Sequence, residues 1–267
     1  MKGAKLMAVI GAVLGDIAGS QFEFNRPENL DYKHCELFTS RCSYTDDTIM
    51  TLAVKKAILE NADFTKTMRE IGQPYPYSGY GGRFYEWMYG ENPKPYNSFG
   101  NGSAMRVSFV GEHFDALEDV ISMAEKSAEV THNHPEGIKG AVVTAVCIWM
   151  ARHGKTKEDI FQYVLEQYPA EKYEFSIAVP LDELEKIYQW NETCMGSVLA
   201  AMCCFYESDS YESFLRNVFR LKCDSDTLAA IGGAVAEEYY GWTGFYNEDE
   251  LLKKYLDANL YNLVKLL

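Results

Sequence analysis

The chain has 267 residues, of which 47% are hydrophobic and 24% charged, a composition that excludes a disordered protein and predicts a single domain over residues 1–267. Its formal net charge of −14, without a run of Lys or Arg to override it, argues against general nucleic-acid binding. A small anionic ligand is still compatible with this charge, because backbone N–H groups and metal ions can hold one.

The seven cysteines form no CxxC pair and are odd in number, which predicts buried thiols in a reducing compartment rather than disulfides or a zinc site. They are Cys35, Cys42, Cys147, Cys194, Cys203, Cys204 and Cys223. The start of the chain, Met1 to Gly15, superficially resembles a signal peptide, but its apolar run is short and soon reaches Asp16. We therefore interpret it as a core helix and expect a cytoplasmic protein without a membrane anchor.

Residues 6–19 carry apolar side chains at helical intervals, and glycines recur at every fourth position: Gly11, Gly15 and Gly19. Such a stripe of small residues allows close packing of another helix. Asp16 and Glu23, within and just after this helix, are candidate site carboxylates, with solvated or capping acids as the alternative.

Residues 25–43 are polar and broken, and we expect a loop there; a helix is expected over 46–60. It begins with four polar residues, Thr45, Asp46, Asp47 and Thr48. Side-chain oxygens at a helix start cap free N–H groups and favour the positive end of the helix dipole. This explains one acidic residue but not two.

The next stretch, 72–101, is rich in Gly, Pro and Tyr, and we expect it to border a cleft with the support of short helices. It leads into Ser98, Phe99, Gly100, Asn101 and Gly102, with a helix expected to start near Ser103. Exposed backbone N–H groups and the helix dipole would cradle a phosphate here. A simple turn is the alternative.

Helices are expected over 116–128 and 137–151, with His132 and His134 between them. Two histidines at this spacing lack a third ligand for zinc, so we expect them to border a pocket, and His132 to contact a ligand. The segment 155–192 has mixed charge and is interpreted as a solvated face or a partner surface.

Further helices are expected over 194–207, 210–221, 226–240 and 248–265, and strand-like alternation is scarce, so the predicted fold class is all-α. The helix over 226–240 is preceded by a second acidic cluster, Asp224, Ser225, Asp226 and Thr227. Capping is the alternative for either cluster alone. Together they favour a site for two divalent cations such as Mg²⁺, with Asp46, Asp47, Asp224, Asp226, Thr45 and Thr227 as ligands.

The ordered set of these motifs resembles the ADP-ribosylglycohydrolase family over nearly the whole chain. The residues that carry the resemblance are Gly15, Asp16, Gly19, Ser20, Glu23, Thr45, Asp46, Asp47, Thr48, the loop from Ser98 to Arg106, Thr131, His132, Asp224, Asp226 and Thr227. Other motif readings fit poorly: a DxD phosphatase needs a preceding buried strand, and a calcium-binding EF-hand needs a Gly where Ala229 stands.

The resemblance implies a compact orthogonal helical bundle with two Mg²⁺ ions, or Mn²⁺, at the bottom of an ADP-ribose cleft. By matching positions, the ligands are the six named above, and Asp16 supports them from behind. Glu23 occupies the place of a glutamate on a mobile loop beside the metals. The segment from Ser98 to Gly102 lines the diphosphate and adenosine side, with His132 nearby.

Hydrolysis of the bond between ADP-ribose and its acceptor is therefore the expected activity, with Glu23, Asp46 and Asp226 as catalytic residues. ADP-ribose or an ADP-ribosylated protein would be the partner. The acceptor linkage, to arginine, serine, an acetyl ester or a nucleic acid, depends on rim loops such as 72–97. Lys222 and Cys223 stand where many family members carry two glycines, which favours a second hypothesis: an ADP-ribose sensor that has lost turnover.

Overall fold

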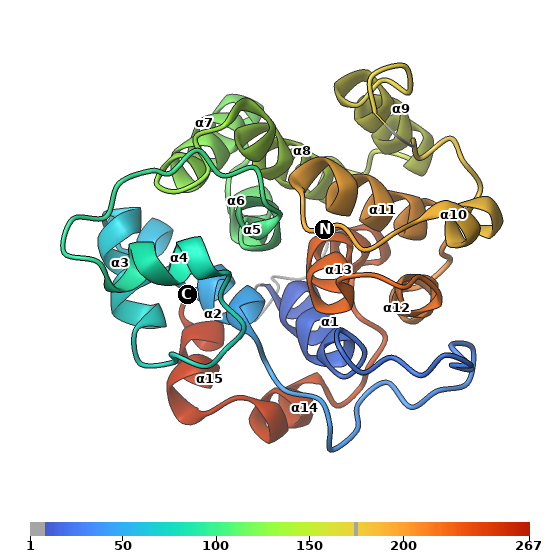
Figure 1. Cartoon of the computed structure of the whole chain (residues 1–267), viewed down its shortest axis with the longest axis horizontal. Helices are drawn as coiled ribbons and strands as arrows, with labels where there is room; N and C mark the ends of the chain where they lie inside the picture. Colours follow the sequence, from blue (N-terminus) through green and yellow to red (C-terminus); the bar gives the residue numbers. More distant parts are fainter. Residues whose placement is uncertain (1–8, 174–175) are drawn as a thin grey trace.

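Two helices from opposite ends of the chain, α1 (Ile10–Ser20) and α13 (Ser225–Tyr240), pack against each other at the centre of the molecule (Figure 1). The computed structural model describes residues 9–173 and 176–267. Both helices are buried on nearly every side. Helices that are apolar all round belong inside a large core rather than at its surface.

The glycine stripe of α1 is the reason for this close packing. A Cβ atom on Gly15 would lie 2.6 Å from the carbonyl carbon of Ala229, and one on Gly19 would lie 2.6 Å from the backbone nitrogen of Asp226. Gly11 contacts α13 further along, at Gly233. The two helices are therefore antiparallel, and the end of α1 lies beside the start of α13.

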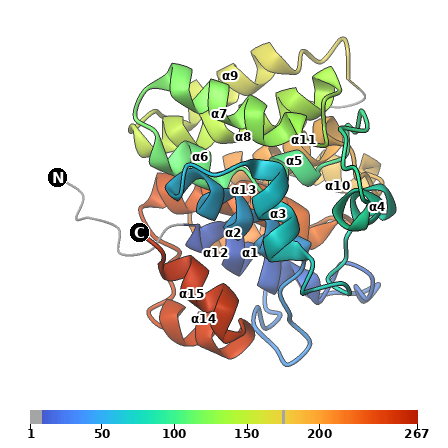
Figure 2. The same cartoon turned by 90° about the vertical axis from the view of Figure 1, so that its left-hand side faces the viewer.

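The remaining helices form an inner group around this pair and an outer group beyond it. The inner helices are α2 (Asp46–Leu59), α5 (Gly102–Met105), α8 (Pro135–Arg152), α11 (Cys194–Tyr206) and α12 (Tyr211–Arg220). The outer helices are α3 (Phe64–Gly72), α4 (Gly82–Tyr89), α6 (Ser108–His113), α7 (Leu117–Glu129), α9 (Lys157–Gln167), α10 (Leu181–Ile187), α14 (Glu248–Tyr255) and α15 (Ala258–Lys265). Figure 2 shows α7, α8 and α9 on one side of the central pair and α14 and α15 on the other.

The predicted all-α class is confirmed, because the described residues contain helices and, outside them, one isolated antiparallel bridge between Gly100 and Thr193. The helix predicted over 6–19 is observed from Ile10, and residues 6–8 lie outside the described ranges. Most other predicted helices agree within two residues. The shorter helices α3, α6, α9 and α10 were not predicted individually.

The single helix predicted over 248–265 is wrong, since the chain forms α14 and α15 with a break between them. Asp257 causes the break: its side chain accepts hydrogen bonds from the backbone N–H groups of Asn259 at 2.8 Å and Leu260 at 3.0 Å. An aspartate that bonds to nearby backbone in this way starts a new helix instead of continuing the old one.

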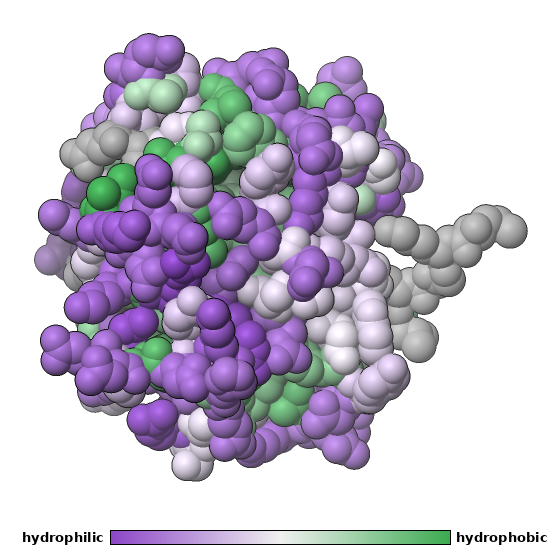
Figure 3. Space-filling view, turned by 90° about the vertical axis from the view of Figure 1, so that its right-hand side faces the viewer, coloured by the Kyte–Doolittle hydropathy of each residue, from purple (hydrophilic) through white to green (hydrophobic). Residues whose placement is uncertain are grey.

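The mixed-charge segment 155–192 contributes to the face around α9, α10 and α12, which is mostly hydrophilic with small hydrophobic patches (Figure 3). Some of its charges pair across elements, as where Arg220 contacts Asp182 at 2.5 Å and Glu185 at 2.6 Å. Among the described helices, none combines the length and the apolar character that crossing a bilayer requires.

The close packing of α1 on α13 makes Gly15 the most demanding position in the core. We expect Gly15→Ala to lower the free energy of unfolding by about 3 kcal/mol, because the new methyl group meets backbone rather than a movable side chain. Gly82→Ala, at the first residue of α4, is the matched control, since a Cβ there has no neighbour within 4 Å, and its effect should stay within about 0.5 kcal/mol. Denaturant unfolding measures both; equal shifts would contradict the packing argument.

Candidate functional site

The starts of α2 and α13 meet at the end of α1 and form one buried acidic centre. Carboxylate oxygens of Asp16, Asp47 and Asp226 lie within 4.8 Å of one another, and those of Glu23, Asp224 and Asp226 form a second such group. Asp226 belongs to both groups. Two helix starts separated by some 180 positions in the chain therefore supply a single site.

Asp16 links the start of α2 to α1. Its Oδ2 accepts hydrogen bonds from the backbone N–H groups of Thr45 and Thr48, both at 3.0 Å, and its Oδ1 accepts one from Thr45 Oγ1 at 2.7 Å. A fully buried carboxylate with these donors holds the start of α2 in place. The position matches the supporting role expected for Asp16.

Capping does not account for the acidic residues. Thr45 is the N-cap of α2 and accepts a hydrogen bond from the N–H of Asp47 at 3.2 Å. Asp224 occupies the N-cap position of α13, yet its side chain makes no capping hydrogen bond and accepts one from Asn101 Nδ2 at 2.8 Å instead. These carboxylates are thus available to something other than helix ends.

One buried carboxylate oxygen of the centre has no hydrogen-bond partner among the described residues, and a cation would satisfy it. Asp47 Oδ2 accepts a hydrogen bond from Thr227 Oγ1 at 3.2 Å, whereas Asp47 Oδ1 is buried without one. An unpaired buried acceptor is costly, and a second carboxylate cannot supply a donor. The donor set consists of carboxylate and hydroxyl oxygens, which fits hard divalent ions such as Mg²⁺ or Mn²⁺.

Without a cation, the acids of this centre resist ionisation. Burial, followed by the charge of Asp224, raises the pKa of Glu23 to about 7. Burial raises the pKa of Asp16 to about 6, although its hydrogen bonds with Thr45 and Thr48 oppose the shift. Burial and neighbouring carboxylates raise the pKa of Asp47 and Asp226 well above the usual range. Positive charge is the feature that would let all of them ionise together.

Asp46 lies beside these groups rather than within them. Its side chain is half-buried and lines the adjoining cleft, and its backbone N–H donates to the carbonyl oxygen of Ser78 at 2.7 Å. Burial and the charges of Asp16 and Asp224 raise its pKa well above the usual range. Thr45, in contrast, does not line the cleft, and its hydroxyl donates a hydrogen bond to Asp16 Oδ1.

A cleft of about 490 Å³ opens over the acidic centre. Of the predicted substrate contacts, Ser98, Gly100, Asn101, Gly102 and His132 line it. Phe99 does not; its ring is 44% exposed and lies against His134, with ring centroids 5.1 Å apart. Other lining residues were not predicted individually, among them Arg83, Phe84, Tyr96 and Arg106; the first three lie in the stretch 72–101, which was expected to border a cleft.

The loop at 98–102 is held by the segment that precedes α11. The N–H of Asn101 donates to the carbonyl oxygen of Glu192, and the N–H of Cys194 donates to that of Phe99, both at 2.8 Å. The Asn101 side chain also donates to Ser197 Oγ at 3.0 Å. Asn101 therefore connects the cleft wall to Asp224 and orients that carboxylate.

His132 presents a fixed hydrogen-bond donor to the cleft. Arg106 Nη2 donates to Thr131 Oγ1 at 2.8 Å, so the only hydroxyl hydrogen of Thr131 is free to donate to His132 Nδ1, 2.7 Å away. The opposite tautomer would leave that buried hydroxyl hydrogen unpaired. His132 Nε2 thus carries the hydrogen, and it faces Gly102. Burial, with Arg106 and Arg83, holds the pKa of His132 well below its usual value, so the ring is neutral.

The two residues that replace glycines before the second cluster leave the cleft open. Lys222 is exposed, and Cys223 is buried with its thiol donating to the carbonyl oxygen of Val218 at 3.6 Å. Neither side chain is among those that line the cleft. Neither side chain therefore occupies the cleft over the acidic centre.

Comparison with known proteins assigns the chain and its fold to one family. The model of the family described as ADP-ribosylglycohydrolase matches residues 5–262. The chain belongs to the ADP-ribosylglycohydrolase family. It is similar to human ADP-ribosylhydrolase ARH3, with 27% identity covering 86% of this chain and 84% of that protein. It is also similar to the putative ADP-ribosyl glycohydrolase L543 of Acanthamoeba polyphaga mimivirus, with 23% identity covering 70% and 67%.

The fold agrees with a solved structure described as an ADP-ribosylglycohydrolase-related protein complex. The TM-score is 0.71 at 22% identity, and the match covers 97% of this chain and 95% of that one. An ADP-ribosylglycohydrolase fold is thus shared over almost the full length. The acidic centre described above lies inside the region matched by the family model.

The wall residues that were not predicted individually come from segments without a distinctive motif. Arg83 and Tyr96 belong to the broken stretch between 72 and 101, and Phe24 and Glu192 line the cleft from two other loops. Arg106 follows α5, the short helix that begins at the end of the loop at 98–102, and is fully buried, which a charged residue rarely is. That position beside a glycine-rich loop was the one available signal.

Carboxylate repulsion predicts how the metal-free protein responds to pH. Acids whose pKa is raised on folding hold protons more tightly in the folded state, so stability falls as pH rises from about 4.5, the ordinary pKa of a Glu side chain, towards about 7, the pKa of Glu23 in the folded protein. In chelator at pH 7, we expect Asp226→Asn to unfold at a higher temperature than the unmodified protein. Added Mg²⁺ should stabilise the unmodified protein and not the variant. Equal stabilisation of both would contradict a site at Asp226.

The hydrogen-bond chain through Thr131 makes a separate prediction about His132. In the ¹⁵N spectrum, the ring should show one neutral tautomer, protonated at Nε2, without titrating between about pH 5 and 8. Thr131→Val removes the hydroxyl and should give a mixture of tautomers, whereas Thr131→Ser should preserve the single form. A single tautomer in the valine variant would show that another group sets it.

Proposed function

We propose that this protein is a metal-dependent hydrolase that cleaves the glycosidic bond between ADP-ribose and an acceptor, with the whole chain acting as one ADP-ribosylglycohydrolase-like domain. One observation carries the proposal: two overlapping carboxylate groups, joined through Asp226, lie at the bottom of a cleft whose wall is a glycine-rich loop. Family membership supports it.

The distribution of charge in the cleft suits ADP-ribose. The acidic centre supplies one end, and the wall contributes Arg83 and the buried Arg106, whose Nε and Nη1 hydrogens have no hydrogen-bond partner among the described residues. A buried guanidinium with free donors favours an anion nearby. The diphosphate would lie along the loop at 98–102 with the His132 donor, which directs the terminal ribose towards the carboxylates.

Asp47, Asp224 and Asp226 are the proposed metal ligands, with Asp46 and Thr227 at the edge of the site and Asp16 and Thr45 holding the start of α2 behind them. Two Mg²⁺ ions, or Mn²⁺, would bind here. When bound, such ions supply positive charge that orients sugar hydroxyls and favours ionisation of a bound water.

Glu23 is the proposed proton-transfer residue. It lies at the edge of the second carboxylate group, half-buried, on the turn that follows α1. A carboxyl group with a pKa near the working pH can both give and take a proton, which glycosidic cleavage requires at the leaving group and at the attacking water. Without a cation, burial and the charge of Asp224 raise the pKa of Glu23 to about 7, and bound cations would lower it from there.

The alternative hypothesis, an ADP-ribose sensor without turnover, was based on Lys222 and Cys223. Neither residue lines the cleft, so that argument loses its physical basis.

The cysteines are free thiols, six of them buried, which supports the proposal that the protein works in the reducing cytoplasm on ADP-ribose or ADP-ribosylated protein.

Release of free ADP-ribose from substrates with defined linkages tests the proposal. We expect release with Mg²⁺ and none with chelator. Glu23→Gln should lower kcat by about 100-fold or more while ADP-ribose binding, measured by calorimetry, persists. The exposed Lys222→Ala is the control and should keep full activity. Binding of ADP-ribose without release from any linkage would support the sensor instead.

A further inference from the structure

Two exposed aromatic rings meet beside the acidic centre. Phe24, which directly follows Glu23, is 76% exposed, and Trp190, from the segment between α10 and α11, is 41% exposed. Their rings stack with centroids 5.9 Å apart and an angle of 28° between their planes. Large aromatic rings left in solvent at the mouth of a cleft mark a contact site for a partner or ligand.

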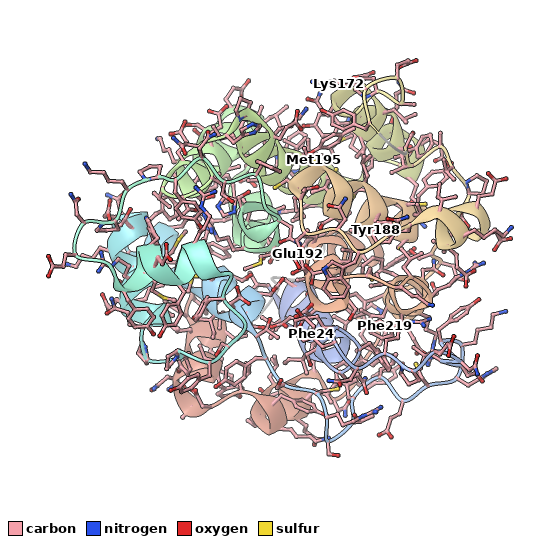
Figure 4. The ribbon with its side chains drawn as sticks, in the orientation of Figure 1. Phe24, Lys172, Tyr188, Glu192, Met195 and Phe219 are labelled. Carbon is pink, nitrogen blue, oxygen red and sulfur yellow. The ribbon has the colours of Figure 1, made fainter. Side chains whose placement is uncertain are left out.

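A carboxylate accompanies this pair. Trp190 Nε1 donates to Glu192 Oε1 at 2.8 Å, and Glu192 is exposed and lines the cleft together with Phe24. Figure 4 shows Phe24 and Glu192 near each other at the centre of the face, between the end of α1 and the start of α11. Within the described ranges, neither Glu23 nor Glu192 forms an ion pair.

The location of this group relative to the sugar indicates what it would contact. If the diphosphate lies along the loop at 98–102, the terminal ribose lies at the carboxylates and the acceptor projects past Glu23. Phe24 follows Glu23 in the chain, and the ring of Trp190 stacks on the ring of Phe24. This step rests on the proposed function, because only then does an acceptor leave the cleft in this direction.

We propose that Phe24, Trp190 and Glu192 form an acceptor subsite, which selects peptides carrying a basic side chain next to the ADP-ribosylated residue. Aromatic faces attract a cation through their quadrupole, and the carboxylate adds a direct ion pair. The negative charge of the chain, −14 overall, works in the same direction. The subsite recognises the residues that flank the modified residue rather than the chemical linkage to ADP-ribose.

Two ADP-ribosylated peptides with the same linkage test the subsite, one with Lys and one with Glu on both sides of the modified residue. Binding to Glu23→Gln in Mg²⁺ is measured by calorimetry, which needs no turnover. We expect the Lys peptide to bind about fivefold or more tightly than the Glu peptide. Adding Glu192→Lys should reverse the preference, and adding Trp190→Ala should reduce it. Tyr246→Ala, at a 95% exposed aromatic residue away from the cleft lining, is the matched control and should preserve it.

Hydrolysis of the same peptides by the unmodified protein separates this inference from the proposed function. If neither peptide is cleaved but the Lys peptide binds more tightly, the subsite stands and the proposed activity fails. If both are cleaved and bind equally well, the activity stands and the subsite is wrong. The subsite is also wrong if Trp190→Ala weakens binding of both peptides by the same factor, since the aromatic pair would then act only as a cover over the cleft.

Discussion

The close approach of α1 to α13 is the contact on which the rest of the site depends. Backbone meets backbone along the glycine stripe, and no side chain at Gly15 or Gly19 could be accommodated without separating the helices. Because the two helices are antiparallel, this contact brings Asp16 and Glu23 beside Asp226. The acidic centre is therefore a consequence of helix packing, and its geometry is as rigid as the core that surrounds it.

Burial of so many carboxylates is unfavourable in the absence of a counter-charge, and the fold compensates for it locally. Asp16 is satisfied by the start of α2, and Asp224 by Asn101, whereas Asp47 keeps one oxygen without a partner. The carboxylates with hydrogen-bond partners are held in fixed orientations. The unpaired oxygen of Asp47 would be stabilised by a bound cation. This division between supporting and ligating oxygens is common in metal sites, where the surrounding hydrogen bonds position the ligands.

The cleft is asymmetric in charge, and the asymmetry gives the ligand a direction. Arg106 and the neutral His132 provide donors on one wall, and the carboxylates accept at the bottom. For the proposed ADP-ribose ligand, this asymmetry favours one orientation, with the diphosphate beside the donors and the terminal ribose at the carboxylates. Phe24 and Glu192 also line the cleft, and Trp190 contacts both of them; this is the group proposed above as an acceptor subsite.

The sequence alone determined the helical class, the glycine stripe and both acidic helix starts, because helical periodicity, small-residue spacing and capping chemistry are local properties. It also indicated the loop at 98–102 and His132, although the tautomer of His132 depends on Arg106 and Thr131 together. Only the tertiary structure decided which acids line the cleft and which hold the start of α2, that Asp257 divides the last helix, and that Trp190 meets Phe24. Those outcomes depend on contacts between different segments, many of them far apart in the chain. The spacing of residues within one segment does not predict such contacts.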